Sequence, residues 1–195
     1  MAGTRPKRER KFRPELSTAR LLLRSPRRSD RVALVHLMND RLIAKNTLSV
    51  PTPYRLSDAD AWISRHQRGS RDPRSLSLLI TRKSDGAVLG GISLRHDKSP
   101  FLRAELGYWL GREHRRQGYM SEAVEAVCRW GFAKAHLHRI EAAVFPHNPA
   151  SMSLLRKAGF LKEGRLREAV RKNGTWHDDV LFGLVHPRPR PPSQR

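Results

Sequence analysis

The sequence predicts a single mixed α/β domain, and three observations support this prediction. The chain has 195 residues, which is enough for one substantial hydrophobic core. Its apolar residues alternate between strand-like and helix-like runs, in the order β-α-α-β-β-β-α-β-α-β-β. No internal repeat breaks this order. We therefore expect a sheet flanked by helices over residues 16–186.

The first elements are a strand and two helices. The apolar run at residues 18–26 is typical of a strand, and residues 29–40 have the spacing of an amphipathic helix. Ser29 or Asp30 is placed to cap this helix, because a short polar side chain accepts hydrogen bonds from free N–H groups of the first turn. A second helix is expected over Leu56–Gln67, again with a serine or aspartate at its start.

Three strands follow. Residues 75–82 and 88–95 are apolar runs on either side of Asp85-Gly86, and Asp-Gly is a strong hairpin signal. We expect these two strands to pair antiparallel. Residues 104–111 form the next strand, which leads into a basic turn.

A long helix is expected from about Gly118 to Ala133, followed by a strand over residues 139–146. Several residues of this helix recur at helical spacing and are predicted to face the core. They are Met120, Ala123, Val124, Val127 and Gly131.

The last elements are a short helix and a hairpin. Asn148 is placed to cap the helix, Pro149 occupies its first position and Gly159 lies just past its end. Residues 160–185 are typical of two long strands around the turn Asn173-Gly174.

The basic turn before the long helix, HRRQGYMSEA at residues 114–123, is a candidate binding site. A strand that runs into a turn and then a helix leaves backbone N–H groups without intrahelical partners, and the helix dipole adds to their positive potential. Such a corner binds a pyrophosphate well. Gly118 keeps the approach to the backbone open, and Arg115 and Arg116 add positive charge.

Composition and missing motifs exclude several classes of function. The chain carries 39 Lys and Arg against 18 Asp and Glu, and the formal net charge of +21 attracts RNA, ribosomes or phosphorylated cofactors. Neither the Walker A spacing nor Gly-x-Gly-x-x-Gly is present, which argues against an NTPase and a dinucleotide dehydrogenase. No apolar run is long enough for a membrane span, and the one cysteine, Cys128, suits the cytoplasm. We expect no metal site, because further ligands around the histidines are missing.

The basic turn also resembles a known signature. Residues 115–120, RRQGYM, resemble the acetyl-CoA signature Arg/Gln-x-x-Gly-x-Gly/Ala of the GNAT acetyltransferases, with Met120 where Gly or Ala is usual. Residues 107–124 and 138–185 resemble the RimJ/RimL group of ribosomal-protein-alanine N-acetyltransferases. The resemblance implies the GNAT fold, in which helices flank a central, mixed, mostly antiparallel sheet of seven strands.

By this resemblance, acetyl-CoA is the co-substrate. The backbone of the turn would wrap its pyrophosphate, the preceding strand would pair with its pantetheine amides, and Asn148 would contact the pantetheine arm or position the turn before its own helix. The residues implied in cofactor binding are Tyr108, Trp109, Leu110, Arg115, Arg116, Gln117, Gly118, Tyr119, Met120 and Asn148.

Two residues are candidates for catalysis. Glu105 is placed to take a proton from the acceptor amine through a water, and an exposed strand glutamate is the alternative reading. An α-amino group, with a pKa of about 7.7–8.0, needs no strong base. Many GNAT enzymes carry a tyrosine acid where this chain has Leu155. The resemblance instead implies that Ser151 donates a hydrogen bond to the leaving sulfur. The alternative is that Ser151 is an ordinary helix serine that faces solvent.

We therefore expect an acetyl-CoA-dependent N-acetyltransferase that acts on a protein N-terminus, that of a ribosomal protein. The basic arm, residues 1–15, would assist contact with the ribosome or RNA, and a proline-rich tail, residues 187–195, follows the domain. The protein would act in the cytoplasm as a monomer or dimer, with no membrane partner.

Two alternatives remain open. In one, the acceptor is a small amine such as a polyamine or an antibiotic, which needs several acidic residues in the acceptor pocket. Candidates for these are few: Asp58, Asp60, Glu105, Asp178 and Asp179. In the other, the chain is a ribosome- or RNA-associated protein that no longer catalyses, although Gly118, Asn148 and Ser151 are intact.

Overall fold

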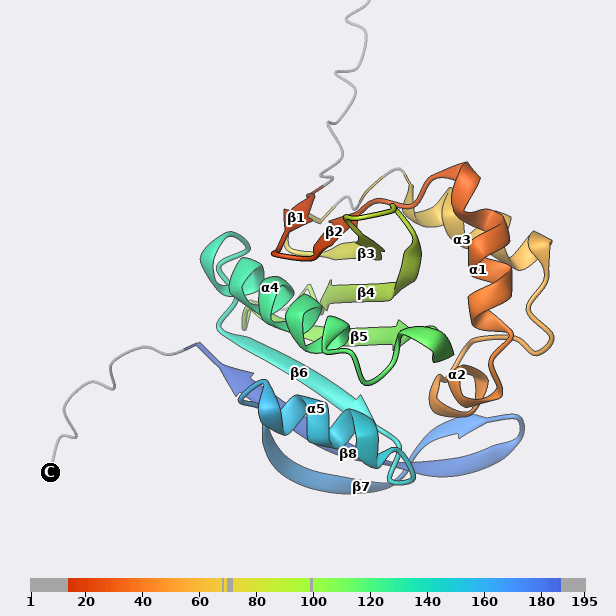
Figure 1. Cartoon of the computed structure of the whole chain (residues 1–195). Helices are drawn as coiled ribbons and strands as arrows, with labels where there is room; N and C mark the ends of the chain where they lie inside the picture. Colours follow the sequence, from red (N-terminus) through yellow and green to blue (C-terminus); the bar gives the residue numbers. More distant parts are fainter. Residues whose placement is uncertain (1–13, 68, 70–71, 99, 187–195) are drawn as a thin grey trace, which may run out of the picture.

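The computed structural model describes residues 14–67, 69, 72–98 and 100–186. The predicted tail, and the predicted arm apart from Pro14 and Glu15, lie outside these residues. Figure 1 shows a central sheet with helices on both faces, which confirms the expected fold class. The helices are α1 (Arg31–Met38), α2 (Arg41–Asn46), α3 (Leu56–His66), α4 (Tyr119–Ala133) and α5 (Pro149–Lys157), with short 3₁₀ turns at Arg28–Asp30 and Arg112–His114.

The described residues form a sheet of eight strands in the order β1-β2-β3-β4-β5-β6-β8-β7. Its strands are β1 (Leu16–Ser17), β2 (Leu21–Arg24), β3 (Leu76–Arg82), β4 (Val88–His96), β5 (Arg103–Leu110), β6 (Arg139–Val144), β7 (Leu161–Lys172) and β8 (Thr175–Val185). Seven strands were expected, and the additional one is the two-residue β1. Such a short strand has no alternating pattern, so it cannot be predicted from the sequence.

One face of the sheet carries the main core under α4 and α5. Alternation along β3 shows how the faces divide, because Leu78 and Ile80 belong to this core while Leu79 packs with α1 and α3 on the other face. The predicted core face of α4 is confirmed, since Met120, Ala123, Val124, Val127 and Gly131 are all buried.

The helix starts differ from the expected ones in detail. Asp30 caps through a 3₁₀ turn before α1: it accepts from the Arg27 N–H at 2.6 Å and pairs with buried Arg24 at 2.8 Å. Helix α3 begins one position after Arg55, whose N–H donates to Asp58 at 2.7 Å. Helix α2 was not expected, because six residues are too short for a helical pattern.

Strands β5 and β6 are the parallel neighbours of the sheet, and they pair at their beginnings alone. The register joins Arg103 to Arg139, Ala104 to Ile140 and Glu105 to Glu141. Residues 106–110 of β5 do not pair with residues 142–144 of β6. The two strands therefore separate, and the β6 side of β5 keeps backbone groups that no neighbouring strand uses.

Candidate active site

The turn between β5 and α4 presents a row of free backbone donors. Within the described part of the chain, the N–H groups of residues 116–121 donate to no acceptor, and the first helical bond runs from Glu122 to Gly118 at 3.1 Å. Arg116 and Gly118 both have left-handed backbones, with φ of 59° and 79°. This winding exposes consecutive N–H groups at the positive end of a 15-residue helix, which is a geometry for binding phosphate.

The back of this turn is held by Arg20, a residue that no local pattern in the sequence predicts for the site. Its guanidinium donates to the Gln117 carbonyl at 3.0 Å and to Glu122 at 2.7 Å, and it lies 4.6 Å from the centre of the Tyr119 ring. Burial alone would raise the pKa of Glu122, but hydrogen bonds from Thr18 and Arg20 outweigh it and lower that pKa. These contacts fix the shape of the turn from the opposite side.

The two arginines of the turn have different surroundings. Arg115 donates to the Leu110 carbonyl at 3.2 Å and forms an ion pair with Asp40, so its charge is directed toward α2. Arg116 is exposed and has no ion pair among the described residues. The positive charge available at the turn is therefore that of Arg116.

A cleft of about 1870 Å³ begins at this turn and runs between β5 and β6. Most of the residues predicted for the site line it: Glu105, Tyr108, Trp109, Leu110, Arg115, Arg116, Met120, Asn148 and Ser151. Gln117, Gly118 and Tyr119 are not among its lining residues and belong to the turn itself. The cleft reaches both faces of the sheet, because Tyr108 packs with the main core while its neighbour Trp109 packs with the α1 and α3 cluster.

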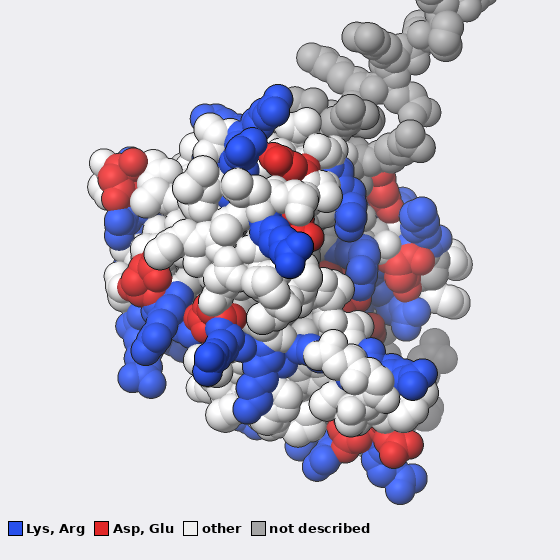
Figure 2. Space-filling model, turned by 90° about the vertical axis from the view of Figure 1, so that its right-hand side faces the viewer, with Lys and Arg blue, Asp and Glu red and all other residues white. Residues whose placement is uncertain are grey.

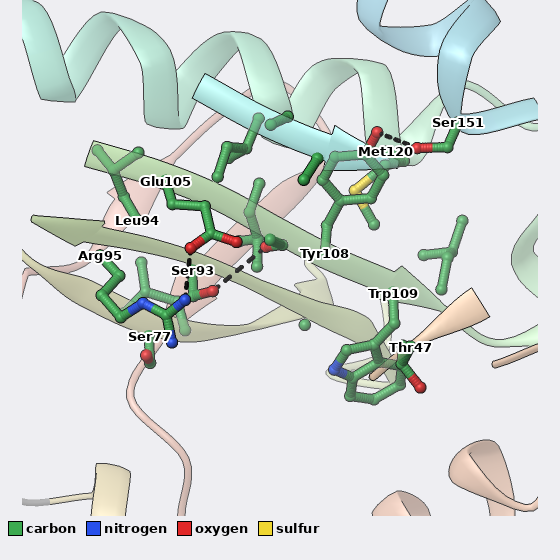
Figure 3. Close-up of a pocket in the computed structure, with 18 of the residues that line it drawn as sticks. Thr47, Ser77, Ser93, Leu94, Arg95, Glu105, Tyr108, Trp109, Met120 and Ser151 are labelled. Carbon is green, nitrogen blue, oxygen red and sulfur yellow. Dashed lines mark hydrogen bonds and ion pairs between the residues drawn. The ribbon is translucent and has the colours of Figure 1, made fainter. Parts of the chain in front are cut away.

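Tyr108 and Ser151 meet inside the cleft, as Figure 3 shows. The phenol oxygen of Tyr108 lies 2.7 Å from Oγ of Ser151. Burial raises the pKa of Tyr108 to about 12, although the bond to Ser151 acts in the opposite direction. The Ser151 N–H donates to the side-chain oxygen of Asn148 at 3.2 Å, so Asn148 caps α5 as the sequence indicates.

Glu105 points to the opposite face of the sheet from Tyr108. Its carboxylate forms an ion pair with Arg95, which lies directly across on β4, and half of its side chain is exposed (Figure 3). Trp109 lies on the same face, with its indole so close over β4 that a Cβ at Gly91 would come within 2.6 Å of Nε1. The cleft therefore has a carboxylate and an indole on one side and two hydroxyls on the other.

Met120 and the one cysteine of the chain are both buried. Met120 is 6% exposed, and its side chain packs in the core while its N–H stays on the turn. Cys128 is also 6% exposed, and burial raises its pKa to about 12, which leaves a poor nucleophile. Among the described residues, no group of three or more His, Cys, Asp or Glu side chains is arranged to hold a metal ion.

Among the described residues, four carboxylates line the cleft: three form ion pairs with arginines, and Asp72 is hydrogen-bonded to His96. Asp72 accepts from His96 at 2.8 Å, and Asp97 pairs with Arg103 at 2.9 Å. Glu105 pairs with Arg95, and Glu141 with Arg139 at 2.6 Å. Because arginines already neutralise three of these four carboxylates, little negative charge is left for a polycation.

No described helix has both the length and the apolar character that a bilayer crossing requires.

Comparisons with known proteins agree with this geometry. The family model described as an acetyltransferase (GNAT) domain matches residues 20–161. YoaA of Bacillus subtilis (strain 168), an uncharacterised N-acetyltransferase, is 33% identical over 180 residues, which cover 90% of this chain and 98% of YoaA. The ribosomal protein uS5-alanine N-acetyltransferase of Escherichia coli (strain K12) is 38% identical over 90 residues, 46% of either chain.

Among solved structures, the microcin C7 self immunity acetyltransferase MccE, in complex with acetyl-CoA and AMP, has the same fold. It matches with a TM-score of 0.76 at 22% identity, over 87% of this chain and 94% of MccE.

Proposed function

The chain belongs to the GNAT acetyltransferase family, and we propose that it transfers an acetyl group from acetyl-CoA to the N-terminal amine of a protein, a ribosomal protein in particular. The observation that carries this proposal is the row of free N–H groups at residues 116–121, next to the separated strands β5 and β6. A diphosphate with an amide-bearing arm fits both features at once.

The residues that would hold acetyl-CoA follow from this arrangement. The N–H groups of residues 116–121 and the guanidinium of Arg116 would bind the pyrophosphate, and the β6 side of residues 106–110 would pair with the pantetheine amides. Asn148 would contact the same arm while it caps α5. Acetyl-CoA supplies the activated acyl thioester.

Ser151 is the residue that we assign to the thioester sulfur. A serine hydroxyl is too weak an acid to give up its proton completely, so its role is to donate a hydrogen bond. Tyr108 supports this role, because its own hydroxyl hydrogen can point at the Ser151 oxygen and leave the serine hydrogen free for the sulfur.

Glu105 is the residue that we assign to the acceptor proton, through a water. Its carboxylate faces the side of the cleft away from Ser151, and it is exposed enough for a water to reach it. An α-amine with a pKa of about 7.7–8.0 is partly neutral at physiological pH, so a carboxylate is a sufficient base.

A protein N-terminus fits the cleft better than a polyamine does. The lining carboxylates Asp72, Asp97, Glu105 and Glu141 are all paired, and a polyamine would have to break several of these pairs. A single α-amine makes no such demand. The relative that acetylates ribosomal protein uS5 supports the choice of a ribosomal acceptor.

Contact with the ribosome or RNA, in the cytoplasm, is part of the same proposal. Figure 2 shows Lys and Arg side chains spread over the face that carries α1 and α3, with Asp and Glu between them. Such a mixed face offers no single basic patch, so we assign this contact to the basic arm, residues 1–15.

The test is a competition between acceptors. Purified protein with acetyl-CoA is offered an N-terminal peptide of a ribosomal protein, the same peptide with its N-terminus blocked but a lysine present, and spermidine. Mass spectrometry identifies the products. We expect acetylation of the free α-amine; preference for spermidine or lysine would contradict the proposal, and no product at all would favour a non-catalytic protein.

A further inference from the structure

A lysine at the tip of the β7–β8 hairpin reaches across to helix α2. Nζ of Lys172 donates to the backbone carbonyls of Ala44, of Lys45 at 3.1 Å and of Thr47 at 2.7 Å. These partners lie 125 or more residues away in the chain. Figure 1 shows the hairpin curving under α2, so that the two segments lie side by side.

The contact completes a helix end that is otherwise incomplete. The last carbonyls of a helix have no intrahelical partners, and the helix dipole makes them attractive to a cation. In α2 the Thr47 hydroxyl donates to the Ile43 carbonyl at 2.7 Å, and Lys172 donates to the next two carbonyls, those of Ala44 and Lys45. A helix of six residues has little stability of its own, so its end depends on this lysine.

Lys172 also contacts the segment that leads to the catalytic serine. Its Nζ lies 5.7 Å from the centre of the Phe145 ring, which stacks on His147 at 5.3 Å and meets His177 edge-on at 5.6 Å. His147 directly precedes Asn148, the cap of α5. Lys172 therefore stands where the hairpin, the end of α2 and the turn before Ser151 come together.

The chain that follows α2 is a wall of the cleft. Residues 46–50 line it on one side, and Asn148 and Ser151 line it on another. Because Lys172 binds the carbonyls at the start of this wall, it determines where the wall stands relative to the α5 turn.

We propose that Lys172 is a positioning residue for the acceptor: it holds residues 46–50 at the distance from the α5 turn that the acceptor amine requires. This inference rests on the proposed acetyl transfer, although it does not depend on which amine is acetylated. Among the described residues, the polar and ring contacts of Lys172 reach neither the diphosphate turn nor β5. Binding of the cofactor should therefore not need this lysine.

The experiment replaces Lys172 by methionine, which keeps the aliphatic length and removes the three hydrogen bonds. The matched control is Lys162→Met, an exposed lysine on the same strand. Steady-state kinetics use whichever acceptor the wild-type protein acetylates, and calorimetry gives the Kd of acetyl-CoA. For Lys172→Met we expect a KM for the acceptor that rises about tenfold, with the Kd of acetyl-CoA unchanged. Lys172→Arg should recover part of the loss, and Lys162→Met should behave as wild type.

Hydrogen exchange separates this inference from the proposed function. In Lys172→Met, amides of residues 41–50 should exchange faster while those of α4 keep their protection. An unchanged acceptor KM in a folded Lys172→Met variant overturns the inference. If the wild type acetylates only spermidine, the proposed acceptor is wrong, and the KM of spermidine then tests Lys172. If it acetylates nothing, both proposals fail.

Discussion

The hydroxyl groups of Tyr108 and Ser151 lie 2.7 Å apart and connect strand β5 to the first turn of α5. Leu155, which occupies the helix position where the GNAT resemblance places a tyrosine, is fully buried. The phenol in this cleft therefore comes from the strand. Its hydrogen bond gives Ser151 a fixed orientation that a lone serine on a helix surface would not have.

Replacing Tyr108 by phenylalanine should lower kcat and leave cofactor binding almost intact. The ring and its packing remain, while Ser151 loses the bond that orients it. Because one hydrogen bond contributes about 0.5–1.5 kcal/mol, we expect kcat to fall by roughly three- to tenfold. Stopped-time assays at saturating acetyl-CoA measure the fall, and calorimetry measures the Kd.

The control for Tyr108→Phe is a double-mutant cycle with Ser151→Ala. If the two hydroxyls act together, the double variant should be no slower than Ser151→Ala alone. Fully additive losses would show that they act separately. Since the pKa of Tyr108 is about 12, this residue should add no ionisation step to the kcat profile below pH 10.

Replacing Gly118 by arginine should abolish binding of acetyl-CoA. Gly118 has a φ of 79°, and a Cβ there would lie 3.2 Å from Nη2 of Arg20, so an arginine side chain would displace Arg20 from the back of the turn and distort the row of N–H groups that Arg20 supports. In the wild type, acetyl-CoA at a hundred times its Kd adds about 2.7 kcal/mol of stability, which raises Tm by roughly 5–10 °C. The variant should show no such rise.

Gly86→Arg is the matched control for Gly118→Arg. Gly86 has a similar φ of 72°, with no atom within 4 Å of its Cβ position. Both variants bear the same backbone strain and lose stability without ligand. Only the change at Gly118 should remove the Tm rise, and a normal rise in Gly118→Arg refutes the assignment of the diphosphate to this turn.

Arg115 and Arg116 should give opposite results when each is replaced by methionine. Arg115→Met leaves the largely buried Asp40 without its cationic partner, so we expect Tm to fall by roughly 3–10 °C, which corresponds to about 1–3 kcal/mol. Arg116→Met removes an exposed charge beside the proposed diphosphate. Its Tm should stay close to wild type, while the Kd of acetyl-CoA rises about tenfold. Thermal denaturation measures Tm and calorimetry measures the Kd. A Tm loss in Arg116→Met together with a weaker Kd in Arg115→Met would contradict this assignment.

The local parts of this molecule can be predicted from the sequence, and the long-range parts cannot. The α4 core face, the Asn148 cap and the Asn173-Gly174 turn depend on neighbouring residues, and the structure contains all three. Two other features need the whole fold: Arg20 reaches a turn 97 residues away, and Lys172 reaches the end of α2. Neither residue has a local pattern that distinguishes it from the other basic residues of this chain.

Replacing Glu105 by glutamine should slow the reaction most at low pH. If the carboxylate takes the acceptor proton, its loss should lower kcat/KM by roughly ten- to a hundredfold at pH 7. The deficit should shrink at pH 9, where an α-amine with a pKa of about 7.7–8.0 is already neutral. A deficit that stays constant with pH would point to a role in packing.

Arg95→Met serves as the control for Glu105→Gln. It breaks the same surface ion pair but keeps the carboxylate, so kcat/KM should remain near the wild-type value. Tm should change little in both variants, since exposed ion pairs contribute about 0–1 kcal/mol.

Acidification from pH 7 to pH 5 should destabilise the protein through partly buried histidines such as His66. Burial is the main cause that lowers its pKa below 6.5, and its Nδ1 lies 2.8 Å from the Trp62 carbonyl. The folded protein therefore binds fewer protons than the unfolded chain just below pH 6.5, so the free energy of unfolding falls as the pH decreases through that range.

His66→Gln should reduce this pH dependence while it lowers Tm at both pH values, because the ring also packs on Trp62 with centroids 4.6 Å apart. The decisive quantity is the difference in Tm between pH 7 and pH 5, measured by circular dichroism without ligand. His36→Gln, at a side chain that is 77% exposed, is the control and should keep the wild-type difference. Because protonation of this partly buried ring is the cause of the pH dependence, an equal difference in wild type and His66→Gln would rule out His66 as its source.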